Sequence, residues 1–106
     1  MHAQLAFFEG PRSPELVAAM DRASVERIEP AILNDPFARS ELIANYVLRQ
    51  PDGGAVMVTI TRTEAGLRRG QEVVMSTELL PGEDPALLPG PDRVEIYDVV
   101  QVSQTS

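Results

Sequence analysis

The residue types that the sequence lacks limit the reactions that the protein can catalyse. Its 106 residues include no cysteine, no tryptophan and no lysine, and His2 is the one histidine. Without cysteine there is no disulfide, no thiolate metal site and no cysteine nucleophile. Without lysine there is no lysine Schiff base and no P-loop lysine. Several common catalytic mechanisms are therefore excluded.

Long hydrophobic runs are also absent. No stretch approaches the roughly 18 consecutive apolar residues of a membrane-spanning helix. The short apolar run within residues 1–8 has no basic residues before it and is too short for a signal peptide. We therefore expect a cytoplasmic protein that has no membrane partner.

Charge argues against a nucleic-acid partner. The chain carries 16 acidic and 9 basic residues, a net charge of −7, and its arginines are dispersed along the sequence. Such a protein repels a phosphate backbone. The apolar fraction of 43% is that of an ordinary globular protein. The length fits one domain, predicted over residues 1–102, with 103–106 as a frayed tail.

The periodicity of the apolar residues, and the glycines and prolines that interrupt it, predict six elements. Their order is strand, helix, strand, strand, helix, strand. Ser13-Pro14 begins the first helix as N-cap and first-turn proline, and Pro30 is expected to kink it. Residues 34–36 are expected to stop that helix, and residues 51–54 to form a turn between the second and third strands. Thr61 or Thr63 caps the second helix. The predicted strands are 4–9, 41–49, 55–61 and 93–102, and the predicted helices are 14–33 and 64–80.

This order is typical of a ferredoxin-like βαββαβ fold, an α+β architecture with a four-stranded antiparallel sheet. Right-handed crossovers predict the strand order 4-1-3-2, with both helices on one face. Val56, Val58 and Ile60 share the other face, which is apolar where a monomer would be polar. We therefore predict a homodimer in which two such sheets pair into an α+β barrel.

The chain resembles the dimeric α+β barrel superfamily, and within it the antibiotic-biosynthesis-monooxygenase-like proteins. The resemblance lies in residues 8–11, 27–31, 59–65 and 94–97. It implies a homodimer with a small pocket between sheet and helices in each subunit. Some members of this group oxidise aromatic polyketides without a cofactor, and others bind and degrade haem.

The sequence departs from both active branches of that family. Thr61 stands where the family often has tryptophan, and residues 64–80 contain no histidine to bind haem iron. Leu5 stands near the position of the asparagine that accompanies that histidine. We therefore predict no cofactor and no haem or metal site.

Several single residues allow two interpretations. His2 is a solvated terminal residue, a metal ligand or a base, and the carboxylates of Glu9, Glu95 and Asp98 are rim charges or a paired acid site. Tyr46 and Tyr97 are core residues or hydrogen-bond a substrate. The remaining residues that sequence alone leaves open are Asn45, which faces outward or into a pocket, Met20, Met57 and Met75, which fill core gaps or line a pocket, and Ser24 and Gly70, which permit close packing or leave room for a ligand.

Alternation along the strands and the inward stripes of the helices predict one mainly apolar cavity that takes a small apolar or aromatic ligand. Three functions are compatible with it. The first is a non-catalytic small-molecule-binding or stress-type protein, the second a cofactor-independent monooxygenase of an aromatic or polyketide-like substrate, and the third an accessory or structural subunit. The predicted lining residues are Leu5, Phe7, Met20, Ser24, Met57, Thr59, Thr61 and Gly70.

Overall fold

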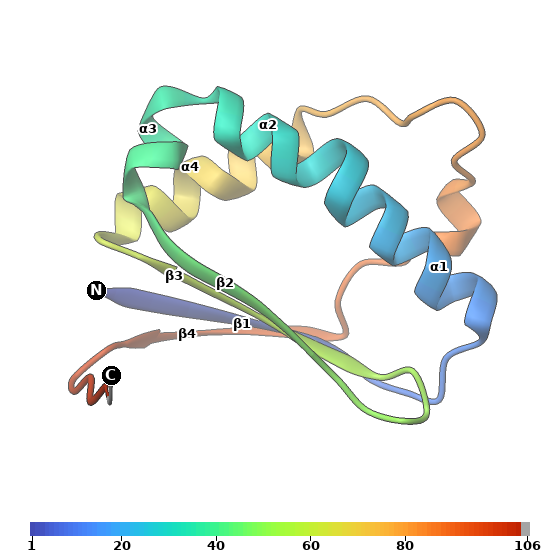
Figure 1. The fold of residues 1–106 in the computed structure, drawn as a ribbon, viewed down its shortest axis with the longest axis horizontal. Helices are drawn as coiled ribbons and strands as arrows, with labels where there is room; N and C mark the ends of the chain where they lie inside the picture. Colours follow the sequence, from blue (N-terminus) through green and yellow to red (C-terminus); the bar gives the residue numbers. More distant parts are fainter. Residues whose placement is uncertain (105–106) are drawn as a thin grey trace.

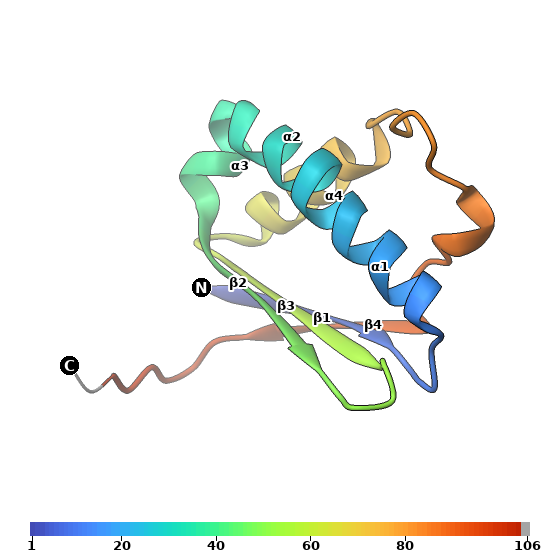
Figure 2. The same ribbon diagram turned by 45° about the vertical axis from the view of Figure 1, so that its right-hand side comes forward.

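The computed structural model describes residues 1–104, so residues 105–106 of the predicted tail lie outside the description. Four antiparallel strands form one sheet, and all the α-helices lie on one side of it (Figures 1 and 2). The elements in chain order are β1 (His2–Phe8), α1 (Pro14–Arg22), the π-helix η1 (Ala23–Ile28), α2 (Glu29–Asn34), α3 (Pro36–Glu41), β2 (Leu42–Arg49), β3 (Ala55–Thr61), α4 (Glu64–Met75), the 3₁₀-helix η2 (Pro85–Leu87) and β4 (Arg93–Asp98).

The strand order is β2-β3-β1-β4, which is the predicted order read from the opposite edge. Both outer strands pair antiparallel to their inner neighbours, and β1 pairs antiparallel to β3 in the centre. The ferredoxin-like α+β arrangement expected from the sequence is confirmed. The two predicted crossover helices are present on the expected common face.

The first predicted helix is helical from Pro14 to Asn34, through three consecutive segments. The Ser13 side chain accepts a hydrogen bond from the Leu16 N–H, as an N-cap does. Pro30 has no N–H to donate, and its ring would crowd the carbonyl four residues before it. The chain accommodates Pro30 by widening into η1, where the N–H of Glu29 reaches back five residues to the carbonyl of Ser24.

Helix α3 was not predicted, because residues 34–36 were interpreted as a helix stop. Asp35 instead caps a new helix by accepting a hydrogen bond from the Ala38 N–H at 2.9 Å, and Pro36 occupies the first turn. This is the same pattern of short polar cap and proline that begins α1. The helix ends at Glu41, so β2 starts at Leu42.

The last two elements are shorter than predicted. Helix α4 ends at Met75, because the hydroxyls of Ser76 and Thr77 donate to carbonyls of its last turn, those of Val73 and Val74. Strand β4 ends at Asp98, since β1 is its one partner and the ladder finishes with the bond from the Val99 N–H to the Met1 carbonyl.

The strand register assigns the strand residues to two faces of the sheet, since directly paired residues share a face. The covered face, beneath the helices, carries His2, Gln4, Ala6 and Phe8 of β1 with Thr61, Thr59, Met57 and Ala55 of β3. The open face carries Ala3, Leu5 and Phe7 with Ile60, Val58 and Val56. The ion pair from Arg49, which lies opposite Ala55, to Asp21 of α1 identifies the side that faces the helices.

The core beneath the helices is built from small residues. Ala6, Ala23 and Ala55 are buried, together with Phe8 and Leu67. Within residues 1–104 no large side chain is fully buried. The helix layer and the sheet therefore do not close tightly on one another within one chain.

Candidate functional site

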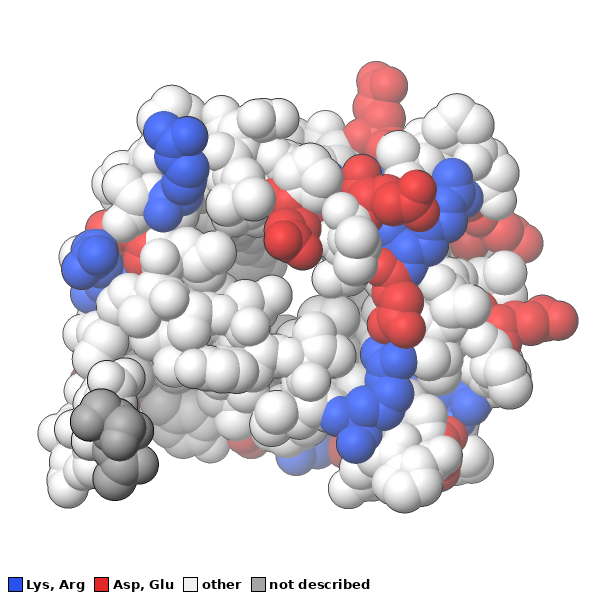
Figure 3. All heavy atoms as spheres, viewed as in Figure 1, with Lys and Arg blue, Asp and Glu red and all other residues white. Residues whose placement is uncertain are grey.

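A hollow separates the helix layer from the covered face in the middle of the molecule (Figure 3). Met57 and Thr59 of β3 lie on the covered face, and both are only half-buried despite their central strand. Met20 and Ser24 lie on the inward stripe of the first helix and are also half-buried. We call this space the helix–sheet hollow, and it is the candidate site.

A row of polar side chains crosses the floor of the hollow. Gln4, Thr59 and Asn45 are direct neighbours on β1, β3 and β2. The Thr59 hydroxyl donates a 3.0 Å hydrogen bond to Oδ1 of Asn45. That bond leaves the Asn45 amide group and the Gln4 carboxamide as donors for a bound molecule. A polar row at the centre of a sheet is unusual, because packing there favours apolar residues.

Gly70 contributes open space to the roof. It lies on the inward stripe of α4, between the buried Leu67 and Val73. A Cβ atom placed on Gly70 would meet one neighbouring atom within 4 Å, Cδ1 of Ile32 at 3.8 Å. The glycine therefore leaves space that a larger side chain could fill.

The eight predicted lining residues do not share one cavity. Thr61, Thr59 and Met57 lie on the covered face, but Leu5 pairs with Val58 and Phe7 with Val56, on the open face. The prediction placed strand one in the wrong phase, because alternation within a strand does not fix its register against a neighbour. Gln4 and Ala6 take the places that had been assigned to Leu5 and Phe7. Thr61 is buried, and its hydroxyl donates to the carbonyl of Thr63.

His2 is more organised than the solvated terminal residue that the sequence favours. It begins β1, opposite both Thr61 and Asp98, so its backbone is held by ladders on two sides. Its Nδ1 lies 3.0 Å from Oδ1 of Asp98, and 28% of its side chain is exposed. The pair stands on the covered face, one row from Gln4. Sequence reasoning missed it because the partner is 96 positions away and only the register joins them.

The other ambiguous residues divide between the faces. Tyr46 and Tyr97 lie on the open face and are 53% and 52% exposed. Glu95 also lies there and accepts a hydrogen bond from the Tyr97 hydroxyl, which raises the pKa of Tyr97 above its ordinary value. Because Asp98 is on the covered face, Glu95 and Asp98 do not form a paired acid site. Glu9 instead pairs with Arg93.

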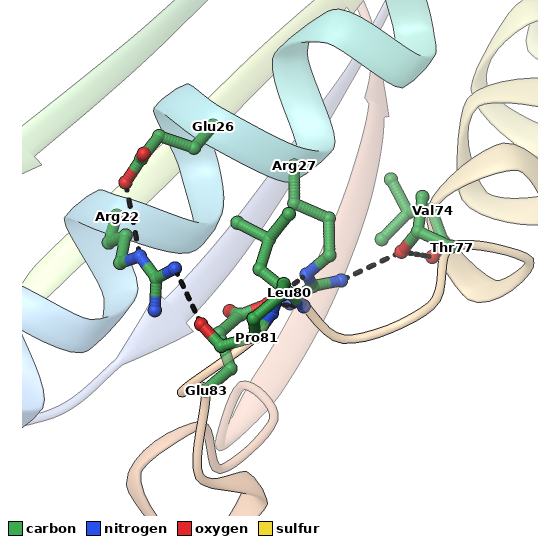
Figure 4. Close-up of polar contacts among 8 residues, drawn as sticks. All are labelled: Arg22, Glu26, Arg27, Val74, Thr77, Leu80, Pro81 and Glu83. Carbon is green, nitrogen blue, oxygen red and sulfur yellow. Dashed lines mark hydrogen bonds and ion pairs between the residues drawn. The ribbon is translucent and has the colours of Figure 1, made fainter.

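A second polar cluster joins the loop after α4 to the first helix (Figure 4). Oε1 of Glu83 accepts hydrogen bonds from the Leu80 N–H at 2.6 Å and from Nε of Arg27 at 2.9 Å. Arg27 also donates to Thr77, and Arg22 donates to the Pro81 carbonyl. The Leu80 N–H, followed by Arg27, holds the pKa of Glu83 below its usual range.

This cluster clamps the loop to the first helix through a buried carboxylate. The Glu83 side chain is 3% exposed, and its Oε2 is buried without a hydrogen-bond partner. A ligand cannot reach an oxygen that solvent cannot touch. A cavity of about 330 Å³ lies between α1 and the loop, and its lining includes Arg22 and Glu83 of the clamp together with Leu87 and Leu88. None of the predicted site residues lines it.

No family model matches the chain, and no curated protein matches it either. Among solved structures, the chain is similar to a dimeric ferredoxin-like protein from an uncultured marine organism, with a TM-score of 0.61. The two share 13% sequence identity, and the alignment covers 98% of this chain and 90% of that one. The chain has a ferredoxin-like fold. At this identity the similarity concerns the fold alone.

Two further observations bound the site chemistry. Among residues 1–104, no three His, Cys, Asp or Glu side chains gather closely enough to hold a metal ion. In the same part of the chain, none of the helices has the length and apolar character needed to cross a membrane. The covered face therefore offers hydrogen bonding by the polar row, apolar contact, and the His2–Asp98 pair one row from Gln4.

Proposed function

We propose that this protein is a homodimeric member of the dimeric α+β barrel superfamily, close to its antibiotic-biosynthesis-monooxygenase-like branch, and that it binds a small, flat, mainly apolar molecule in the helix–sheet hollow. The polar row of Gln4, Thr59 and Asn45 on the hollow's floor carries the proposal. Central strand positions are ordinarily filled by apolar side chains, yet Gln4 and Thr59 are half-buried on the two inner strands, and the exposed Asn45 continues the row on the outer strand β2. A ligand with one or two oxygen atoms would hydrogen-bond to this row.

The walls suit such a ligand. Met20 and Met57 are flexible apolar side chains that adapt to irregular shapes. Ser24 and Gly70 are small and leave room between them. Ligand sites are generally apolar pockets with a few polar groups that fix orientation, which is the composition of this hollow.

Filling the hollow tests the binding proposal. The change Gly70→Leu places a branched side chain into the open space beside Ile32 and should abolish binding of a flat aromatic ketone such as 2-tetralone. Binding is measured by saturation-transfer NMR, and folding by circular dichroism. The matched control Gly70→Ala adds one methyl group at ordinary contact distance and should keep binding. Undiminished binding by a folded Gly70→Leu variant would remove the hollow as the site.

The open face supports the homodimer. Leu5, Phe7, Val56, Val58 and Ile60 form a continuous apolar surface that none of the helices covers. Tyr46 and Leu48 extend it across β2, at 53% and 54% exposure. Contiguous apolar patches that are exposed on a protein surface mark interaction surfaces. A face that is the same on every copy is self-complementary in a two-fold dimer.

The solved structure described above is itself a dimeric ferredoxin-like protein, which also favours this assembly. Analytical ultracentrifugation at micromolar concentration should give twice the monomer mass. A monomer under these conditions would refute the assembly and leave the hollow untouched, since the hollow lies on the other face of the sheet.

A further inference from the structure

We infer that His2 is a general base that moves a proton on the molecule bound in the helix–sheet hollow, with Asp98 as its positioning residue. The inference rests on the proposed function, because it requires a ligand in the hollow. It adds an activity, proton transfer at a carbon beside a carbonyl group, to a site described so far by binding alone.

The geometry of His2 meets the requirements for a base. A base needs a fixed backbone and a group that orients its ring. Strand pairing on both sides fixes the backbone, and the Asp98 carboxylate lies 3.0 Å from Nδ1. A carboxylate accepts hydrogen bonds, so it selects the tautomer with the proton on Nδ1. The lone pair is then on Nε2, free to accept a proton.

The imidazole ring of His2 is partly exposed to solvent. Of the His2 side chain 28% is exposed, whereas Asp98 is 77% exposed at the outer edge of the sheet. Asp98 therefore approaches from the solvent side of the pair. On the other side, Thr61 and Gln4 are the covered-face neighbours of His2.

Gln4 supplies the second half of the site. His2 and Gln4 are two residues apart on one strand, so their side chains leave the same face about 7 Å apart. A carbonyl oxygen lies about 2.4 Å from the adjacent carbon. With a contact of about 3 Å to each side chain, the total is slightly longer than the separation of His2 and Gln4. The line of contacting atoms is therefore slightly bent. One molecule can therefore present a C–H group to His2 and its carbonyl oxygen to the Gln4 amide.

The step conserves atoms and electrons without a further reactant. Nε2 of His2 takes the proton from the carbon beside the carbonyl. The electron pair of the broken C–H bond forms the C=C bond of an enolate, and the carbonyl π pair moves to oxygen, which accepts a hydrogen bond from the Gln4 carboxamide. The imidazolium then returns a proton to the carbon. The substrate class is a flat ketone with an acidic adjacent C–H bond.

The test uses the full chain and 2-tetralone in D₂O. Deuterium entry beside the carbonyl is followed by proton NMR, and binding is followed separately by saturation transfer. We expect the wild type to accelerate exchange, and His2→Gln to lose about 100-fold or more of that acceleration while still binding the ketone. The control Glu78→Gln removes one negative charge in an exposed loop, as Asp98→Asn does beside His2, and should exchange like the wild type.

Two further variants separate chemistry from structure. Added imidazole should restore exchange to His2→Ala, which a purely structural role of His2 does not allow. Asp98→Asn should lower kcat with little change in KM, and Asp98→Glu should recover part of the loss. These Asp98 variants keep the test decisive even if a His2 variant unfolds.

The outcomes distinguish the two proposals. Binding without wild-type acceleration, or equal exchange by His2→Gln and the wild type, overturns the acid–base role and leaves the binding proposal standing. Failure of the wild type to bind 2-tetralone counts against the hollow as a site for flat ketones, and the acid–base role falls with it.

Discussion

The two faces of the sheet use the same strands for different purposes. On β3, Val56, Val58 and Ile60 point to the open face, and Met57, Thr59 and Thr61 point to the covered face. The face beneath the helices would be expected to be the more apolar, because it is the one a single chain can bury. The opposite holds here: the covered face carries Gln4 and Thr59 at its centre, and the open face is apolar across its middle.

This difference between the two faces shows where side chains are packed and where space is left between them. The helix layer is fastened to the sheet and to itself by ion pairs such as Asp21–Arg49, Asp35–Arg69 and Arg27–Glu83. Fastening by charged pairs at the periphery leaves the centre of the covered face unfilled. The open face has no such ion pairs across its apolar middle, and its apolar side chains are those that the second sheet of the proposed dimer would cover.

A carboxylate placed at position 58 or at the adjacent position 59 of β3 should have different effects on assembly, and these are the largest effects that we predict. Val58→Asp places a carboxylate on the open face, where dimer formation would bury it unpaired at a cost of about 3–5 kcal/mol. We expect monomers or unfolded protein by sedimentation. Thr59→Asp places the same charge in the hollow, beside Asn45 and Gln4, and should leave the dimer intact while weakening ligand binding. Identical sedimentation of the two variants would mean that the faces do not differ as described.

Two glycines of α4 differ in the space that surrounds them. A Cβ atom on Gly66 would lie 2.6 Å from Oε1 and 2.7 Å from Cβ of Glu41, a buried residue that also bonds the Thr63 hydroxyl. Gly66→Ala should therefore destabilise the fold by about 1–3 kcal/mol, as overpacking does. Gly70→Ala should stabilise it by up to about 1 kcal/mol, the helix preference for alanine.

Urea unfolding of both variants measures this difference. If Gly66→Ala proves as stable as Gly70→Ala, then α3 and α4 do not approach each other as closely as the Glu41 contact requires.

The sequence was sufficient for the elements whose signals are local. The turn at residues 51–54 and the alternation of Val56, Val58 and Ile60 predicted β3 with its observed bounds, and Ser13-Pro14 predicted the start of α1. Helix α3 carried the same local signal in Asp35-Pro36, and it was missed because proline there was interpreted only as a stop. The cap signal of α3 was present in the sequence, but the proline was wrongly interpreted.

The site was less predictable, because it depends on pairing between distant strands. The prediction for Ser24 and Gly70 rests on helical stripes, which are local and do not depend on strand pairing. Leu5 was assigned to the wrong face, since the phase of β1 against β3 is fixed by register and not by the alternation of either strand. The His2–Asp98 pair depends in the same way on the register of β1 against β4.

Acid should loosen the covering layer, and this is the smallest effect that we predict. The hydrogen bond from Arg69, then the Ala38 N–H, lowers the pKa of Asp35 below its ordinary value of 3.8, and Glu83 is lowered below 4.5 by the Leu80 N–H and Arg27. A carboxyl group whose pKa is lower in the folded protein stabilises it above the unfolded pKa, and that contribution is lost as pH falls through the folded value.

The urea midpoint of the wild type should therefore decline as pH is lowered from about 5 to about 3. Asp35→Asn and Glu83→Gln should be less stable than the wild type near neutral pH and should converge with it in acid, because the group that titrates has been removed. Amide hydrogen exchange should accelerate first in α3, α4 and the loop that follows α4, ahead of β1 and β3. Parallel curves for the wild type and both variants would show that these pairs do not hold the helices on the sheet, and the covered face would then owe its cover to its few buried apolar contacts alone.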